Sequence, residues 1–337
     1  MTTETNQSDH KPLKPWRSYG DQLTLLRERG LHVDDDVAAR DYLARLGYYR
    51  LSGYWYPLRQ INVAASVEAK KPIRTDIFAP GSHFQKVVAL YVFDKKLRLL
   101  ALDALERIEM AVRVDVAHVL GQRDPLGHLK PEHLHGNFTK KRHLKGLNIG
   151  KTEHELWLEK FSRQLQQARR QDFVKHHQQT YGDIPVWAAV EVWDFGLLSK
   201  LYAGMQYEDR QRIAARYGAQ DGETLGQWLR SLNFIRNVAA HHSRLWNINV
   251  LELAPVPKAW SAALREERPF FYFCLMQHLM RQICPNSTWS QRLMTLLCDE
   301  FPREVGTAFN LKDFGLVEGW QAWALWQLPG TRSGGQK

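Results

Sequence analysis

Helical periodicity dominates the chain. Apolar residues recur at steps of three and four along most of it, and no run of short alternating segments of the kind that builds a sheet is present. Glycines separate these periods and mark expected helix ends, as at Gly182, Gly218 and Gly222. The pattern predicts an all-α fold with helices near Tyr19–Arg29, Asp36–Leu46, Ser82–Leu120, Glu153–Tyr181, Pro185–Met205, Glu208–Tyr217, Thr224–Trp246, Pro269–Cys284 and Ser290–Glu300.

The longest predicted helix, Ser82–Leu120, contains neither Gly nor Pro, and Gly121 is its expected stop. An unbroken helix of this length spans about 58 Å at a rise of about 1.5 Å per residue. Its apolar positions fall along one seam, which is typical of a helix that organises a bundle. The seam consists of Leu90, Leu97, Ala101, Ala104, Ile108 and Ala111.

The composition adds a strong positive charge. The 337 residues include 46 Lys and Arg against 36 Asp and Glu, which gives a net charge of +10 and a pI near 9.5. Such a balance indicates a polyanionic partner, with nucleic acid ahead of an anionic membrane surface. No stretch approaches the roughly 18 consecutive apolar residues of a spanning helix, and the amino terminus lacks the apolar segment of a secretory signal. We therefore expect a cytoplasmic protein that binds nucleic acid and no membrane.

The positive charge is concentrated between residues 140 and 175, a segment that contains ten basic residues and four acidic ones. A solvated helical face is the simpler interpretation of such a run, but a basic loop leading into a basic helix also suits contacts to a phosphate backbone. Charge alone does not separate RNA from DNA. The residues expected to bind nucleic acid are Lys140, Lys141, Arg142, Lys145, Arg169 and Arg170.

The segment 232–247, which reads "LNFIRNVAAHHSRLWN", carries polar groups on a helix that otherwise looks like core. One line along the predicted helix is apolar and should be buried: Leu225, Trp228, Leu229, Leu232, Ile235 and Ala239. A second line at the same spacing is entirely polar, and it does not consist of the Glu and Lys pairs that merely solvate a helix. Its members are Arg230, Asn233, Asn237, His241 and Arg244.

Arg236, Asn237 and His241 together suit cleavage of RNA without a metal ion. An Arg presents a permanently charged fork that fits a phosphate, and a His can take or give a proton near neutral pH. The His would deprotonate a ribose 2′-hydroxyl or protonate the leaving oxygen, the Arg would stabilise the transition state, and Asn237 would position the phosphate. By spacing alone, a structural polar network is the favoured interpretation over catalysis.

The hexapeptide "RNVAAH", Arg236 to His241, resembles the Arg-x4–6-His signature of HEPN domains. The wider chain resembles the Abi-like abortive-infection proteins of bacteria, the AbiD/AbiF group, from about Lys14 to Asn249. The segments that carry this resemblance are "LGYYRLSGYWYPLR", "LYVFDKKLRLLALDALERIEMAVR", "YGDIPVWAAVEVWDFGLLSKLY" and "QWLRSLNFIRN".

This resemblance implies an all-helical HEPN bundle, a role in defence against phage, and kinship with HEPN ribonuclease toxins. In that superfamily the Arg and the His act on RNA without a metal or cofactor, usually in a site completed by a second HEPN unit. Carried over, the catalytic residues are Arg236 and His241 with Asn237 beside them, supported by Asn233 and Arg244. One copy of the motif offers a single well-placed His, so we also expect a homodimer.

The expected layout follows from these features. Residues 15–80 form an N-terminal helical segment, 81–250 the HEPN-like bundle and 251–328 a C-terminal helical extension, and residues 1–14 and 329–337 are expected to be disordered. Two function classes stay open at this point. One is a metal-independent endoribonuclease, and the other is a non-cleaving RNA-binding HEPN protein that acts with a small non-coding RNA.

Several other residues have two interpretations. Glu109 and Arg113, four residues apart, form an ordinary ion pair, or else Glu109 orients Arg236 from a neighbouring helix. The aromatic residues of segment 48–56 are expected to pack helices together rather than stack on bases. A metal site is not expected in the histidine-containing loop, because its spacing is irregular and it contains no Cys. The histidines of that loop are His128, His133, His135 and His143.

Overall fold

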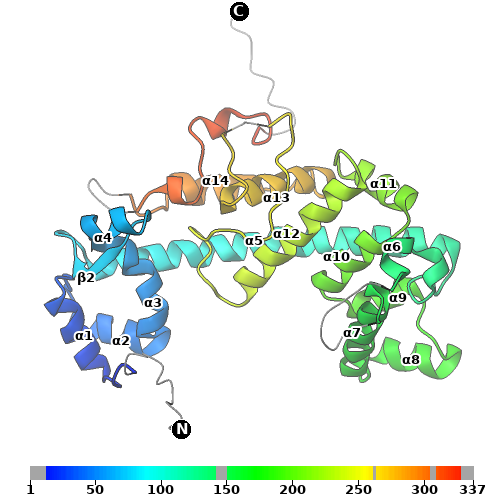
Figure 1. Ribbon diagram of the computed structural model, residues 1–337, viewed down its shortest axis with the longest axis horizontal. Helices are drawn as coiled ribbons and strands as arrows, with labels where there is room; N and C mark the ends of the chain where they lie inside the picture. The colour runs from blue at the N-terminus through cyan, green and yellow to red at the C-terminus, as the bar shows by residue number, and fades with distance from the viewer. Residues whose placement is uncertain (1–12, 142–149, 261–262, 304–308, 328–337) are drawn as a thin grey trace, which may run out of the picture. The chain divides into compact units, whose positions relative to one another are not determined.

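The computed structural model describes residues 13–141, 150–260, 263–303 and 309–327, and the chain divides into two compact units (Figure 1). Unit 1 comprises residues 1–92 with 302–309, and unit 2 comprises residues 93–301 with 310–337. Of the ends that the sequence predicts to be disordered, residues 1–12 and 329–337 lie outside the described residues. The four segment boundaries expected from the sequence stay a prediction.

Unit 1 begins with two helices that the sequence predicts. α1 starts at a capping box in which the Ser18 hydroxyl and the Asp21 carboxylate each accept a backbone N–H of the other, and Asp35 caps α2 by accepting two backbone N–H groups. Two short helices and a 3-10 turn follow that the hydrophobic pattern did not reveal. The elements of unit 1 are α1 (Tyr19–Glu28), α2 (Asp36–Leu46), α3 (Tyr48–Trp55), η1 (Tyr56–Leu58), β1 (Arg59–Ile61), α4 (Val63–Glu68), β2 (Arg74–Phe78) and the first turns of α5.

A small hairpin in unit 1 is the one departure from the expected helical pattern among the described residues. β1 pairs antiparallel with β2, with Arg59 opposite Phe78 and Ile61 opposite Arg74. A strand of three residues is too short for its alternation to stand out in the sequence, which is why no strand was predicted. The prediction of an all-α fold is nevertheless confirmed, because α-helices form all the other long elements of the described chain. None of those helices is long and apolar enough to cross a membrane.

α5 (Phe84–Arg123) is one continuous helix of 40 residues, about 60 Å long. The predicted seam is buried along its whole length except at Ala111, which is partly exposed. The expected stop at Gly121 is wrong, since the helix continues to Arg123. A Cβ at Gly121 would lie 3.2 Å from Trp187 Cε3 and 3.3 Å from Val186 Cγ1, so this glycine permits close packing and does not end the helix.

Two helices that the sequence predicts as continuous are broken in unit 2. The predicted helix over 153–181 splits at Arg169–Gln171, and the predicted helix over 185–205 splits at Trp193–Asp194. Asp194 begins a new helix because its carboxylate accepts the backbone N–H of Leu197 at 2.7 Å. The resulting elements are η2 (Pro131–His133), α6 (Gly136–Thr139), α7 (Glu153–Ala168), α8 (Asp172–Tyr181), α9 (Val186–Ala189), η4 (Val190–Val192) and α10 (Phe195–Gly204).

α12 (Gly222–Ala240) packs against α10, α11 (Tyr207–Arg216) and α13 (Pro269–Ile283). The predicted apolar line along α12 is fully buried. α13 is buried on nearly all sides, and Phe270 on it stacks with Trp326 near the carboxyl terminus. The indole of Trp289 donates to the Leu100 carbonyl of α5 at 2.8 Å. The C-terminal residues therefore complete the core of unit 2. The elements that follow α13 are α14 (Trp289–Cys298), η5 (Leu311–Asp313) and η6 (Trp320–Ala322).

His128 is a fully buried histidine in the core of unit 2. Its ring lies among the aromatic rings of Trp157, Phe161 and Trp193, and neither ring nitrogen has a hydrogen-bond partner among the described residues. Burial, and to a smaller extent the neighbouring His154, lowers the pKa of His128 to about 3. The imidazole is therefore neutral in the folded protein at every pH above that value.

This burial predicts that acid destabilises the fold through His128. An unfolded His has a pKa near 6.5, so below about pH 6.5 the unfolded chain binds a proton that the folded chain excludes. Stability should fall by up to about 1.4 kcal/mol per pH unit between about pH 6.5 and pH 3, with no contribution above that range. In His128→Phe, the free energy of unfolding should therefore fall less steeply as the pH is lowered from 7 to 4. The measurement is urea unfolding at a series of pH values in this range.

The matched control is His176→Phe, which removes a histidine with an exposed side chain from α8 and should leave the pH dependence of stability unchanged. His154, whose pKa burial also lowers, accounts for part of the slope that remains in His128→Phe. If His128→Phe and the wild-type protein lose stability in parallel as the pH falls, the buried imidazole is not responsible.

Candidate functional site

α12 ends one residue before His241, in a closed turn. The His242 N–H donates to the Ala239 carbonyl at 3.1 Å and the Ser243 N–H to the Val238 carbonyl at 3.0 Å, which is the pair of bonds of a Schellman motif. His242 adopts φ 57°, a left-handed conformation that costs a residue other than Gly about 1–2 kcal/mol. The closing turn leaves the His241 side chain exposed at the helix end.

The predicted helix over 224–246 is therefore too long at its carboxyl end. Asn233 and Asn237 lie on α12 and His241 follows directly, with its N–H donating to the Asn237 carbonyl at 3.0 Å. Arg244 lies beyond the left-handed turn, so its predicted place on the same helical face is wrong. The polar line consequently ends at His241.

A buried ion pair on α5 holds the chain beyond this turn. Asp94 and Arg98 are 0% and 4% exposed and form an ion pair one helical turn apart. The Asp94 carboxylate also accepts the N–H of Leu245 at 3.1 Å and of Trp246 at 2.8 Å. Removing one member of such a buried pair typically costs about 3–5 kcal/mol. This anchor, in the segment that begins "LYVFDKKLR", sets where the end of α12 lies.

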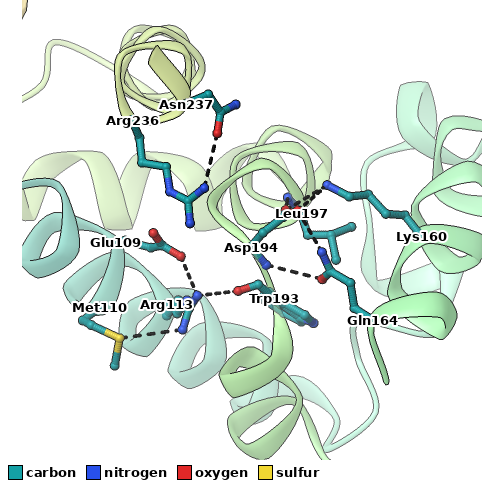
Figure 2. Close-up of polar contacts among 10 residues, drawn as sticks. All are labelled: Glu109, Met110, Arg113, Lys160, Gln164, Trp193, Asp194, Leu197, Arg236 and Asn237. Carbon is teal, nitrogen blue, oxygen red and sulfur yellow. Dashed lines mark hydrogen bonds and ion pairs between the residues drawn. The ribbon is translucent and has the colours of Figure 1, made fainter. Parts of the chain in front are cut away.

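Arg236 points from α12 toward the carboxylate of Glu109 on α5, as Figure 2 shows. Its guanidinium donates to Asn237 Oδ1 at 3.3 Å, and among the described residues this is its one hydrogen bond. Attraction to Glu109 adds an electrostatic contact without a hydrogen bond. Arg236 is thus oriented by two neighbours while most of its five N–H donors stay uncommitted.

Glu109 is 9% exposed and binds Arg113, the partner four residues on that the sequence predicts. Arg113 also donates to the carbonyl of Trp193, at the break between η4 and α10 (Figure 2). Burial raises the pKa of Glu109, and the charges of Arg113 and Arg236 oppose that rise. The ion pair of Glu109 with Arg113 is confirmed, and the role of Glu109 in orienting Arg236 stays a prediction.

A second carboxylate, Asp194, was not identified from the sequence as a site residue. Its oxygens accept from Lys160 Nζ at 2.6 and 2.9 Å and from Gln164 Nε2 at 2.8 Å (Figure 2). Burial would raise the pKa of Asp194, but the bonds from Lys160 and the Leu197 N–H bring the pKa below its usual value. The signal in the sequence is an Asp directly before the apolar run of α10, where a helix cap is expected.

Asn233 lies close to Gly196, the second residue of α10. A Cβ built at Gly196 would lie 3.2 Å from Asp194 Oδ1, 3.4 Å from Lys160 Nζ and 3.7 Å from Asn233 Nδ2. The missing side chain of Gly196 thus leaves room for an amide, an ammonium and a carboxylate to meet at the start of α10. α5, α7, α10 and α12 together supply two carboxylates, three cations and two amides to this polar site, which consists of Glu109, Arg113, Lys160, Asp194, Asn233, Arg236 and Asn237.

The predicted nucleic-acid contacts lie in different surroundings. Lys140 and Lys141 are exposed after α6, whereas Arg142 and Lys145 fall outside the described residues. Arg169 and Arg170 are exposed in the turn that separates α7 from α8. Other basic residues of the same stretch are paired, among them Lys151 with Glu159 at 2.6 Å and Lys160 with Asp194. Binding of nucleic acid by these residues stays a prediction.

The aromatic and histidine residues noted in the sequence divide between core and surface. Tyr54 and Trp55 are buried and pack helices, whereas Tyr49 is 93% exposed. His133 faces Asp124 at 3.8 Å, and His135 Nδ1 accepts the Asn137 N–H that begins α6. His143 lies outside the described residues.

The polar site can bind an anion and move a proton. Arg236 offers a fixed positive charge with free donors, and a guanidinium can hold a phosphate through two parallel hydrogen bonds. His241 lies five residues on, about 7.5 Å along the helix axis and about 140° around it. The exposed His241 side chain forms no hydrogen bond or ion pair among the described residues, so an incoming hydroxyl can reach its ring.

Comparison with known proteins connects this site to a family. A search of the curated proteins and one of the solved structures each find no match. A family model described as Abi-like protein matches residues 41–247, which is more than half of the chain and includes the helices that carry Glu109, Arg236 and His241. The match covers most of the range in which the sequence resembles that family and leaves residues 14–40 outside. The chain therefore belongs to the Abi-like protein family.

Proposed function

We propose that this protein is a metal-independent endoribonuclease of abortive-infection phage defence. Membership of the Abi-like family is consistent with that defence. The observation that carries the nuclease proposal is the state of Arg236, which Glu109 and Asn237 orient while most of its donors remain uncommitted among the described residues. An oriented guanidinium and an exposed histidine on one helical segment supply the charge and the proton transfer that cleavage of a phosphodiester without metal requires.

In the proposed reaction the ribose 2′-oxygen attacks the adjacent phosphorus while a neutral His241 removes the 2′-hydroxyl proton. The bond from phosphorus to the 5′-oxygen breaks, and a protonated imidazole gives its proton to that oxygen. Arg236 stabilises the charge that develops on the phosphoryl oxygens, and Asn237 fixes the guanidinium plane. The products are a 2′,3′-cyclic phosphate and a 5′-hydroxyl.

Glu109 is proposed as a positioning residue in this site. Its carboxylate attracts Arg236 without a hydrogen bond, so the guanidinium can turn its donors toward a phosphate while keeping a compensating charge behind it. Arg113 holds Glu109 by an ion pair and is itself tied to the carbonyl of Trp193. The helices α5 and α12 and the break before α10 thus keep one guanidinium in place, as pre-organised catalysis requires.

The reaction needs both a base and an acid, and one chain supplies one histidine at the end of the polar line. His242, in its left-handed conformation, belongs to the closing turn. We therefore propose that a second copy of this chain completes the site across a two-fold axis, since such an axis places the same patch opposite itself. His241, exposed at the helix end, can serve such an arrangement.

The Arg and His roles predict that Arg236→Ala and His241→Ala each reduce RNA cleavage by about 100-fold or more. The measurement is the cleavage rate of end-labelled RNA by purified protein, with circular dichroism to check the fold. Arg230→Ala is the matched control, because Arg230 is an exposed guanidinium on the same helix. If either variant cleaves RNA at the wild-type rate, the proposed site is wrong. If the wild-type protein binds RNA but never cleaves it, the alternative of a non-cleaving RNA-binding protein is favoured.

The proposed chemistry also predicts the response to chelators and the product ends. Because protons and charge are handled by side chains alone, cleavage should continue at an unchanged rate in EDTA and leave a 2′,3′-cyclic phosphate. Product ends can be identified by their resistance to a phosphomonoesterase before, but not after, acid treatment. Loss of cleavage in EDTA with recovery on adding a divalent ion would instead indicate a metal-assisted mechanism.

A shared site predicts that activity follows the dimer. On dilution, the cleavage rate per chain should fall in proportion to the dimer fraction measured by analytical ultracentrifugation at the same concentrations. Arg236→Ala should dissociate over the same range as the wild type, which separates assembly from catalysis. A monomeric sample that cleaves RNA at the full rate per chain would contradict the shared site.

A further inference from the structure

A cluster of two histidines and one aspartate lies in unit 1, where the α1–α2 connection meets the start of α5. The His32 N–H donates to the Ser82 carbonyl at 2.9 Å, and the Phe84 N–H donates to the His32 carbonyl at 2.9 Å. These two bonds form a parallel bridge between His32 and His83. The backbone thus brings together two imidazole rings that lie 51 residues apart in sequence, with centroids 4.7 Å apart.

Asp34 faces both rings. One carboxylate oxygen lies 2.7 Å from His32 Nε2, and the other lies 3.8 Å from His83 Nδ1. The neighbouring Asp35, not Asp34, caps α2 by accepting the N–H groups of Val37 and Ala38. The Asp34 carboxylate is therefore not needed to begin the helix, and within the described parts of the chain it contacts the two imidazoles.

The three ligand atoms all lie within 4.8 Å of one another. In a tetrahedral zinc site with metal–ligand bonds of roughly 2.0–2.1 Å, ligand atoms are about 3.3 Å apart. One Asp34 oxygen lies 2.7 Å from His32 Nε2 and the other lies 3.8 Å from His83 Nδ1, so rotations of the three side chains would bring one carboxylate oxygen and both ring nitrogens to coordinating positions. The side chains of His32, Asp34 and His83 are 59%, 52% and 34% exposed, which leaves a path for an ion.

We propose that His32, Asp34 and His83 bind one divalent transition-metal ion of the zinc class, with a fourth position open to water. Two imidazoles and one carboxylate suit zinc, cobalt or nickel, whereas calcium and magnesium prefer sites built from oxygen atoms. The ion would tie the α1–α2 connection to the first turn of α5, two segments joined here by the parallel bridge. This site lies outside the residues proposed for RNA cleavage.

The competing interpretation is a pair of His–Asp ion pairs without any metal. In that case the Asp34 carboxylate accepts a hydrogen bond from His32 and faces His83, and added zinc finds no more than the weak affinity of scattered surface histidines. The sequence did not predict the cluster, because His32 and His83 belong to no spacing pattern that metal motifs follow.

Metal binding to the purified, EDTA-treated and dialysed full chain distinguishes the two. Isothermal titration with Zn²⁺ should show one equivalent bound, and Co²⁺ should give the visible absorption of a four-coordinate site. His32→Gln/His83→Gln should lose that equivalent or weaken it at least about 10-fold. The matched control His176→Gln/His177→Gln removes two adjacent histidines from α8 and should bind as the wild type does.

Asp34→Asn keeps both histidines and provides a second variant should the double substitution disturb the fold. It should weaken Zn²⁺ binding and change the Co²⁺ spectrum, while circular dichroism stays as in the wild type. The proposal is overturned if the wild type binds no stoichiometric Zn²⁺ or Co²⁺. It is equally overturned if the wild type and His32→Gln/His83→Gln bind these ions with the same affinity and stoichiometry.

Discussion

Unit 2 is organised by buried carboxylates along α5, each of which must be compensated. Asp94, Glu109 and Asp115 are between 0% and 9% exposed on one helix. An ionised carboxylate without partners in such a place costs several kcal/mol, so each one requires cations or N–H donors from the elements around it. Asp94 has Arg98 and two backbone N–H groups, and Asp115 has Arg216 and the Tyr217 hydroxyl at 2.7 Å. The neighbours of α5 are therefore fixed by charge as well as by apolar packing.

The candidate site is a product of that compensation. Asp94 captures the chain just beyond α12 and so sets where the helix end and His241 lie. Glu109 on α5 then attracts Arg236 on α12. Arg113 forms an ion pair with Glu109 and donates to the carbonyl of Trp193, at the break before α10. A phosphate that approached Arg236 would find a guanidinium already oriented and already partly compensated, which reduces the reorganisation that binding demands. The same contacts that stabilise the fold thus prepare the proposed chemistry.

Two features near the candidate site cost folding free energy: the strained backbone of His242 and the buried ring of His128. His242 holds a left-handed conformation that Gly would adopt without penalty, and in return the motif closes directly after His241. His128 stays neutral within an aromatic cage beside Trp193, the residue whose carbonyl binds Arg113. In unit 1, the bridge between His32 and His83 similarly places side chains in contact through backbone bonds alone. The two hydrogen bonds of the closing turn offset the strain at His242, whereas aromatic rings surround the uncharged ring of His128.

Periodicity and neighbours within two turns, which a linear pattern records, predict the helical class, the buried line of α12, the length of α5 to within a few residues and the pairing of Glu109 with Arg113. The folded chain alone shows that Asp194 caps α10, that α12 ends at Ala240 and that Arg236 points toward Glu109. It also brings His32 to His83. Those outcomes depend on donors and acceptors from segments far apart in sequence, whose meeting is set by packing and by the need to compensate buried charge.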